Sequence, residues 1–353
     1  MITIDGSTGE GGGQVLRTAL SLAAILGQPV EILNIRAGRK QPGLRPQHVQ
    51  SVRAAAAICN ARLEGDHEHS RELRFEPQTP SQAGSYGFEI GTAGAATLVL
   101  QTVLLPLALA GGRSSVVVRG GTHVAWSPPF DYVEQVYLPA VAALGVQCQV
   151  ELIKWGFYPK GGGEIRAAIE PIGAALTGVP PSQTEPWWTR PRGELVSLSV
   201  LSAAANVGNQ VTARQASRAY NRLAAARLGV TPQTRLANPP SLGPGTCLFV
   251  LAEYEHGARA GFTGYGRQGY PAERVADDAV DAFLAFQASD ASVDPHLADQ
   301  LILPLALLDR PLAFRTSQIT QHLLTNIWVV EQFLGPRFAV SGQVGEPGEV
   351  GER

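Results

Sequence analysis

Lysine is scarce in this chain. Of 28 basic residues only Lys40, Lys154 and Lys160 are lysines, and the rest are arginines. None of the three stands in the K-x-D-G context of ligases that adenylate a lysine, which excludes a covalent lysine of that kind. The planar guanidinium of arginine suits phosphate recognition, although arginine-rich codon usage would produce the same excess.

A cysteine framework, a long apolar run and a charge imbalance are also missing. Cys59, Cys148 and Cys247 are scattered without a C-x-x-C pair, which argues against disulfides and favours a reducing, cytoplasmic location. The sequence has no unbroken apolar run of about eighteen residues, so it predicts no membrane-spanning helix. The N-terminus lacks the pattern of a signal peptide. A net charge of -2 gives no bulk basic surface, so any nucleic-acid contact has to be local, such as the gripping of one end. Nothing in the sequence indicates the oligomeric state.

The chain contains an internal repeat. Three segments share one pattern: an apolar helix, a short turn, a β-branched strand that ends in arginine, and a second helix. The strand-end arginines are Arg36, Arg119 and Arg315. Each repeat follows the order β-α-β-α-β, which predicts an α/β or α+β protein with helices packed on sheets.

The repeats are unevenly spaced. The interval from Arg119 to Arg315 is about 113 residues longer than the one from Arg36 to Arg119, which is enough for a small domain. A Pro- and Ser-rich stretch and a Gly-rich stretch bound the extra segment. The expected organisation is a main body of residues 1–180 plus 269–340, an inserted α/β domain at 181–268, and a disordered tail at 341–353.

Two runs of three glycines stand out, "GEGGGQVLR" at 9–17 and "YPKGGGEIR" at 158–166. The first opens an expected helix, where exposed N–H groups and a positive dipole end can bind an anion. Glu10 beside it could hold a divalent cation that bridges phosphate oxygens. The alternative is a plain turn between a strand and a helix. For Gly161–Gly163 we expect a sharp turn between strands.

Other candidate groups are a cationic loop and two histidines. The stretch 35–50 gathers cations and amides that suit a polyanion, or else form a solvated loop: Arg36, Arg39, Lys40, Arg45, Gln47 and His48. His322, near the start of the last helix, could attack phosphorus as a neutral imidazole, or could simply be a packed or surface residue. His296 follows Pro295 at another helix start and could belong to a helix cap.

Several of these motifs together resemble the RNA 3′-terminal phosphate cyclase family. They are "DGSTGEGGGQVLRTALSLA", "IRAGRKQPGLRPQH", "TLVLQT", "RGGTHVAWSPPFDY", "GFYPKGGGEI", "HLADQL" and "HLLTNI". They cover most of the expected main body, with Trp155 standing where the family usually has a basic residue. The resemblance implies an α+β fold of three units, each with two helices on a four-stranded sheet, and one small inserted α/β domain.

The resemblance also implies a reaction and its residues. ATP would adenylate His322, AMP would pass to the 3′-phosphate of an RNA end, and the neighbouring 2′-hydroxyl would then attack to give a 2′,3′-cyclic phosphate. Glu10 matches the glutamate associated with a divalent metal, Mg²⁺ or Mn²⁺. The residues implied to line the nucleotide and phosphates are Gln14, Arg17, Arg39, Arg45, Gln47, His48, Gln101, Pro128, His296, Leu297, Ala298, Asp299 and Gln300.

Two other functions remain open at this stage. An enolpyruvyl transferase is built on a similar repeated unit but needs neither ATP nor a covalent histidine, and "HLLTN" and "GEGGGQ" argue against it. A non-catalytic relative that acts as a scaffold in ribosome assembly would lack the nucleophile, whereas His322 is present.

Overall fold

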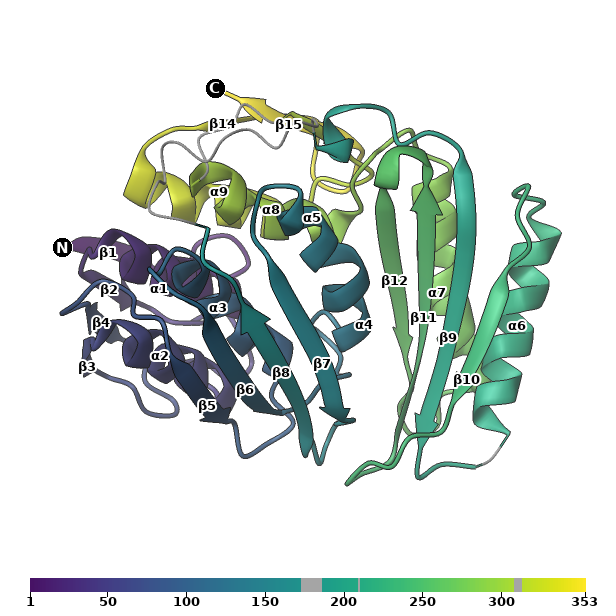
Figure 1. Ribbon diagram of the computed structural model, residues 1–353, viewed down its shortest axis with the longest axis horizontal. Helices are drawn as coiled ribbons and strands as arrows, with labels where there is room; N and C mark the ends of the chain where they lie inside the picture. The colour runs from purple at the N-terminus through teal and green to yellow at the C-terminus, as the bar shows by residue number, and fades with distance from the viewer. Residues whose placement is uncertain (173–185, 209, 308–312) are drawn as a thin grey trace.

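The computed structural model describes residues 1–172, 186–208, 210–307 and 313–353. In those ranges the strands form four sheets, three of them four-stranded and one three-stranded. The chain is therefore a mixed α/β protein made of repeated units, as the sequence predicts (Figure 1). No helix in the described part is long and apolar enough to cross a bilayer.

The first two units have the same topology. The first comprises β1 (Ile2–Asp5), α1 (Gly13–Leu26), β2 (Val30–Leu33), α2 (Pro46–Cys59), β3 (Arg62–Glu64) and β4 (Leu73–Glu76), with strand order β1-β2-β4-β3. The second comprises β5 (Ser85–Glu89), α3 (Ala96–Ala108), β6 (Ser114–Gly120), α4 (Phe130–Tyr132), the π-helical turn η1 (Val133–Tyr137), α5 (Leu138–Ala142), β7 (Cys148–Lys154) and β8 (Gly163–Ile169). Its order is β5-β6-β8-β7, and in both units the first two strands are parallel.

The third unit is shorter by one strand, and it includes residues that were expected to form a disordered tail. It contains α8 (Pro295–Leu307), β13 (Phe314–Thr316), α9 (Gln321–Leu334), β14 (Phe338–Ser341) and β15 (Gly348–Glu352). A single parallel bridge between Val293 and Thr316 stands where the other units have their first strand. The disorder predicted for 341–353 is wrong for β15, which pairs with both β13 and β14 and buries Val350 completely.

The inserted segment forms the remaining sheet. It contains β9 (Leu195–Ala205), α6 (Val211–Ala225), β10 (Gln233–Ala237), β11 (Gly245–Tyr254), β12 (Arg259–Tyr265) and α7 (Ala272–Gln287), with strand order β10-β9-β11-β12 and short 3-10 turns at Trp187–Thr189 and Glu255–Gly257. Helix α7 packs on β12 and pairs with α6 through Arg218 and Asp277, 2.8 Å apart. The helices that cover this sheet are α6 and α7, so the inserted segment continues past the predicted boundary at 268 and ends at Gln287. The other predicted boundary, at 180, lies outside the described residues.

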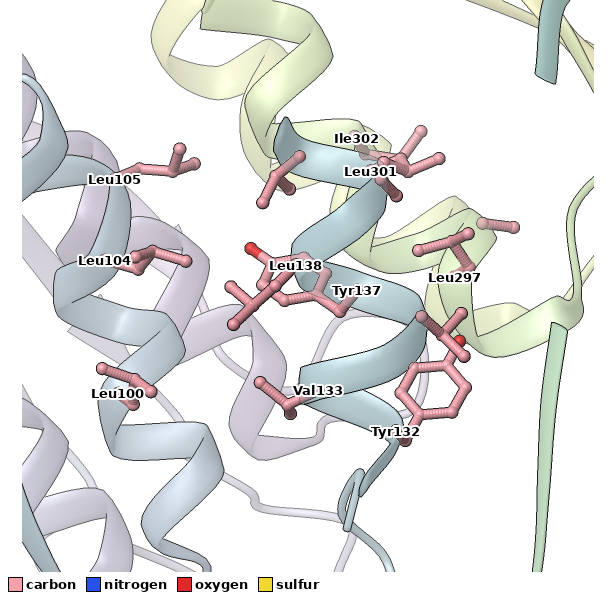
Figure 2. Packing of buried hydrophobic residues seen from close by; sticks show 14 of the residues in the cluster. Leu100, Leu104, Leu105, Tyr132, Val133, Tyr137, Leu138, Leu297, Leu301 and Ile302 are labelled. Carbon is pink, nitrogen blue, oxygen red and sulfur yellow. The ribbon is translucent and has the colours of Figure 1, made fainter. Parts of the chain in front are cut away.

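The core joins the units and fixes the position of the helix starts. Leucines of α3, Tyr132 and Val133 near α4, and Leu297 and Leu301 of α8 form one continuous apolar cluster (Figure 2). Helix α1 packs against α2, α3 and α9, and α8 packs against α9. Because these contacts are between rigid helices, the residues at the starts of α1, α2, α8 and α9 are held in fixed relation to one another.

Candidate active site at the starts of helices α1 and α9

His322 lies on the first turn of α9 and pairs with Glu10. Thr320 caps this helix, since its side-chain oxygen accepts from the backbone N–H of Leu323 at 3.0 Å. His322 Nδ1 lies 3.2 Å from Glu10 Oε1, and Arg39 Nη2 lies 3.1 Å from Glu10 Oε2. The imidazole side chain is 46% exposed, so a ligand can reach it.

The surroundings of His322 favour its neutral form. Partial burial lowers its pKa, the positive charge of Arg17 lowers it further, and Glu10 acts in the opposite direction. The net direction is downward, so the imidazole is uncharged at neutral pH. With the Nδ1–H directed at Glu10, the lone pair on Nε2 is free to act as a nucleophile.

Glycines at the start of α1 let side chains approach closely. Gly11 has φ +54° and Gly12 is the N-cap of α1. A Cβ added to Gly13 would lie 2.3 Å from His48 Nε2 and 2.9 Å from Arg17 Nη1. The predicted glycine run is therefore the point at which the side chains of His48 and the half-buried Arg17 approach the first turn of α1.

Gln14 and His48 are buried polar residues beside these glycines. The amide of Gln14 donates to the backbone oxygen of His322 at 2.9 Å, whereas Gln14 Oε1 is buried without a hydrogen-bond partner among the described residues. His48 Nδ1 accepts from the backbone N–H of Arg45, the N-cap of α2, at 3.1 Å. Burial and the charges of nearby arginines hold the pKa of His48 well below its usual value, so it is neutral.

Helix α8 contributes two acidic residues with different surroundings. Asp294 is fully buried, caps α8 by accepting from the N–H groups of His296 and Leu297, and accepts from the Tyr132 hydroxyl at 2.9 Å. Asp299 lies near Arg17, and burial raises its pKa to about 8 although the arginine opposes the shift. A carboxyl with that pKa is largely protonated at neutral pH and can donate a hydrogen bond.

Amide side chains connect the second unit to its neighbours. Gln101 of α3 donates to Gln300 Oε1 at 2.6 Å, and Gln300 donates to the backbone oxygen of His296 at 2.6 Å. Gln47 Oε1 accepts from the N–H of Ala95, the N-cap of α3, at 3.0 Å. The backbone oxygen of Pro128 accepts from Thr97 on the first turn of that helix at 2.8 Å.

The structure brings seven of the predicted site residues together, and two others pack in the core. The residues close to the starts of α1 and α9 are Glu10, Gln14, Arg17, Arg39, His48, Asp299 and His322, as their contacts and electrostatic couplings show. Leu297 and Ala298 are instead completely buried, so their side chains pack in the core and hold α8 in place. The roles of all these residues stay predictions.

Sequence reasoning missed a polar chain that supports the site. Thr18 donates to Asn326 Oδ1 at 2.9 Å, and Asn326 donates to the backbone oxygen of Asp299 at 3.0 Å. Both residues lie in motifs quoted above, but neither side chain by itself signals chemistry, since only the packing of α1, α8 and α9 brings them together. Asp294 had a signal, because an Asp followed by Pro at a helix start is typical of an N-cap.

Comparisons with family models and with curated proteins agree on one family. The family model "RNA 3'-terminal phosphate cyclase" matches residues 8–340. Curated relatives named RNA 3'-terminal phosphate cyclase include one from Gloeothece citriformis, 46% identical over 94% of this chain and 93% of its own length. One from Nostoc punctiforme is 47% identical over 94% of both chains, and one from Pyrococcus furiosus is 41% identical over 99% of this chain and 98% of its own.

Proposed function

The chain belongs to the RNA 3′-terminal phosphate cyclase family, and from that premise we propose that it uses ATP to convert the 3′-terminal phosphate of RNA into a 2′,3′-cyclic phosphate. His322 attacks the α-phosphorus of ATP and diphosphate leaves. AMP then passes from His322 to the RNA 3′-phosphate. The neighbouring 2′-hydroxyl attacks that phosphorus and AMP leaves. We place the reaction in the cytoplasm.

The observation that carries this proposal is the pairing of His322 with Glu10. A nucleophilic imidazole must be neutral and must present one unprotonated nitrogen. The lowered pKa supports the first requirement, and the 3.2 Å contact from Nδ1 to Glu10 supports the second by orienting the ring. Splitting the reaction at a covalent histidine replaces one difficult displacement by easier ones.

Positive charge around this pair suits the phosphates of ATP and RNA. Arg39 forms an ion pair with Glu10, and the positive charge of Arg17 acts on His322 by lowering its pKa. The starts of α1 and α9 add unpaired N–H groups and positive dipole ends. Such groups stabilise the charge that develops on the departing diphosphate, because they are fixed before the reaction begins.

The residues present also fit a divalent cation. The described residues hold no cluster of three or more acidic, histidine or cysteine ligands, but Mg²⁺ commonly uses one or two protein oxygens together with substrate phosphates. Glu10 offers a carboxylate, and the unpartnered Gln14 Oε1 offers an amide oxygen at the same glycine run. Bound there, the cation would neutralise phosphate charge.

The second and third units supply the nucleotide side. Gln101, Gln300 and His296 form one hydrogen-bonded chain on α3 and α8, where Asp299 also lies. Pro128 accepts from Thr97, one turn before Gln101 on α3. The protonated carboxyl of Asp299 is suited to donate to a hydroxyl or phosphate oxygen of the nucleotide. Arg45, Gln47 and His48 lie at the start of α2, where they can hold the RNA phosphate. Cyclisation itself needs mainly positioning, because the attacking hydroxyl belongs to the same nucleotide.

The test is retention of labelled AMP. Wild-type protein incubated with α-³²P-labelled ATP and Mg²⁺, then denatured, should retain label that acid releases, and His322→Ala should retain none. His67→Ala changes an exposed histidine in the loop between β3 and β4 and serves as the matched control. Label on His322→Ala would show that the nucleophile is another residue. No label on wild type would favour the enolpyruvyl transferase alternative.

A second assay tests the substrate. An oligoribonucleotide with a 3′-phosphate should become resistant to phosphatase in the presence of ATP. The same oligonucleotide with a 2′-deoxy terminal sugar should accept AMP without cyclising, because it lacks the attacking hydroxyl. Loss of AMP transfer together with cyclisation would contradict the order of steps proposed here.

A further inference from the structure

Trp126 is a fully exposed tryptophan in a strained conformation. Its side chain is 99% exposed, in the loop between β6 and α4, and its φ is +67°. A bulky residue in the left-handed region costs conformational energy, and an exposed indole gains nothing from burial. Such strain persists only where the surrounding structure fixes it, and it is concentrated at functional sites.

The loop around Trp126 is fixed at several points. The backbone N–H of Phe130 donates to the backbone oxygen of Thr122 at 3.0 Å, and this bond closes the base of the loop. The hydroxyl of Ser127 donates to the backbone oxygen of Val124 at 2.9 Å. His123 is buried, lies 2.8 Å from Asp131, and stacks on Trp155 with ring centres 4.0 Å apart. The indole of Trp126 is therefore held outward by a rigid loop.

A second exposed aromatic residue comes from the adjacent hairpin. Tyr158 is 75% exposed in the turn that joins β7 to β8. The two segments run side by side, because the N–H groups of Thr122 and His123 both donate to the backbone oxygen of Gly156 and His123 forms a parallel bridge with Phe157. Trp126 and Tyr158 thus lie at the same end of the second sheet, where β6 and β7 end.

Two of the three lysines of the chain belong to the same hairpin. Lys154 ends β7 and Lys160 follows Tyr158, and both are exposed. In the part of the chain that the structure describes, neither lysine has an ion-pair partner. Most exposed arginines nearby are paired, for example Arg119 with Glu164 at 2.7 Å. Exposed aromatic rings next to unpaired cations are the combination that binds single-stranded nucleic acid.

This surface adjoins the proposed active site. Trp126 is two residues from Pro128, so their α-carbons are at most about 7 Å apart. Pro128 in turn holds the first turn of α3, one turn before Gln101. On the hairpin side, a Cβ on Gly161 would lie 2.6 Å from the backbone oxygen of Thr92, in the segment that leads to Ala95 and its contact with Gln47.

We propose that Trp126, Tyr158 and Lys160 form a binding surface for the last nucleotides of the RNA substrate, with the aromatic rings stacking on bases and the lysine contacting the backbone. The inference rests on the proposed function and extends it to residues that the family motifs leave without a role. It also gives a role to the turn at Gly161–Gly163, which belongs to the same hairpin as Tyr158 and Lys160 at this end of the sheet. Stacking is tolerant of base identity, so this surface would accept many RNA ends.

The experiment measures the KM for a 3′-phosphorylated oligoribonucleotide in the cyclisation assay. Loss of one stacked base corresponds to roughly a 5- to 150-fold weakening. We expect Trp126→Ala to raise this KM by that factor with little change in kcat, and Trp126→Phe to restore most of the affinity. Tyr220→Ala removes an exposed tyrosine from α6, on the inserted sheet, and is the matched control.

Oligonucleotides with an abasic site separate stacking from other effects. Each of the last three bases is replaced in turn by an abasic site. At the position that stacks on Trp126, the replacement should raise the KM of the wild-type protein. It should not raise the KM of Trp126→Ala any further, because the stacking contact is already lost. Unchanged KM in Trp126→Ala and Tyr158→Ala, with normal cyclisation, would overturn the proposal and assign these aromatics to a protein partner instead. Loss of histidine adenylation in wild type would instead overturn the proposed function.

Discussion

The two glycine runs of this chain have the same letters and different physical roles. At Gly12 and Gly13 the space left by the missing side chain is filled by other side chains, since a Cβ on Gly13 would meet His48 and Arg17. At Gly161 and Gly163 the space is filled largely by backbone, since a Cβ on Gly163 would lie 2.7 Å from the backbone nitrogen of Gly156, whereas a Cβ on Gly162 would meet the side chain of Leu242. The first run thus brings polar groups together, and the second brings strands together.

Because of this difference, we expect substitutions in the first run to affect catalysis and substitutions in the second run to affect stability. His48 and Arg17 can shift when they are crowded, at a loss of the geometry around His322, whereas the backbone of Gly156 is fixed by hydrogen bonds with Thr122 and His123. Gly161 and Gly162 also have φ near +65° and +71°, as the turn between β7 and β8 requires. A glycine run is therefore informative about chemistry only when one knows what fills the space beside it.

Gly13→Ala should have the largest effect on activity. The added methyl group displaces His48 and Arg17, and through them the first turn of α1 that supports His322. A misplacement of about 1 Å can reduce a rate by about 100-fold, and we expect a loss of that size in the rate of histidine adenylation. The measurement is single-turnover labelling with ATP. A rate within threefold of wild type would show that the close approach is not needed for catalysis.

Gly163→Ala should affect stability instead. Overpacking against a rigid backbone costs about 1–3 kcal/mol, so the midpoint of urea unfolding should fall while the adenylation rate per folded molecule stays near that of wild type. Gly27→Ala is the control, because Gly27 has φ +64° but nothing within 4 Å of its Cβ position. It tests backbone strain alone. A larger loss of stability for Gly27→Ala than for Gly163→Ala would contradict the crowding argument.

The sequence predicted the repeated architecture because hydrophobic periodicity survives in each unit. The strand-end arginine holds for Arg119 in β6 and Arg315 in β13, whereas Arg36 lies in the turn three residues after β2. It did not predict β15, because a segment rich in glycine and glutamate carries almost no local signal. Val350 is buried only through pairing with β13 and β14, which no local pattern reports. The repeat itself held the missing signal, since the first two units each continue with two paired strands after their second helix.

Site residues were predictable where motifs mark them and not where tertiary packing assembles them. His322 and Glu10 stand in recognisable motifs, and the structure places them 3.2 Å apart although they are far apart in the chain. Thr18 and Asn326 lie in the same motifs but look like ordinary helix residues, and their hydrogen bond forms only because α1 packs on α9. The burial that sets the pKa of Asp299 likewise depends on several elements at once.

Glu10→Gln tests the charge next to the first glycine run. Glu10 raises the pKa of His322, so its removal should lower that pKa further and move the acid limb of the adenylation rate to lower pH. The maximal rate should also fall, by about tenfold or more, with a weaker dependence on Mg²⁺, because a carboxylate ligand is lost. The pH profile of single-turnover labelling, taken at several Mg²⁺ concentrations, measures both. An acid limb that moves to higher pH would contradict the assigned electrostatics.

His48→Gln should have the smallest effect, on the pH dependence of stability. The folded pKa of His48 is well below that of an unfolded histidine, about 6.5. The unfolded chain therefore binds more protons below that pH, and the contribution of His48 is present above about pH 6.5 and lost as the pH falls toward its folded pKa. The slope from this one group is at most about 1.4 kcal/mol per pH unit.

Glutamine can still accept from the N–H of Arg45 but does not titrate. Urea unfolding of both proteins at pH 7.5 and pH 5.5 should show a smaller loss of stability for His48→Gln. An equal loss would mean that groups other than His48 carry the acid sensitivity.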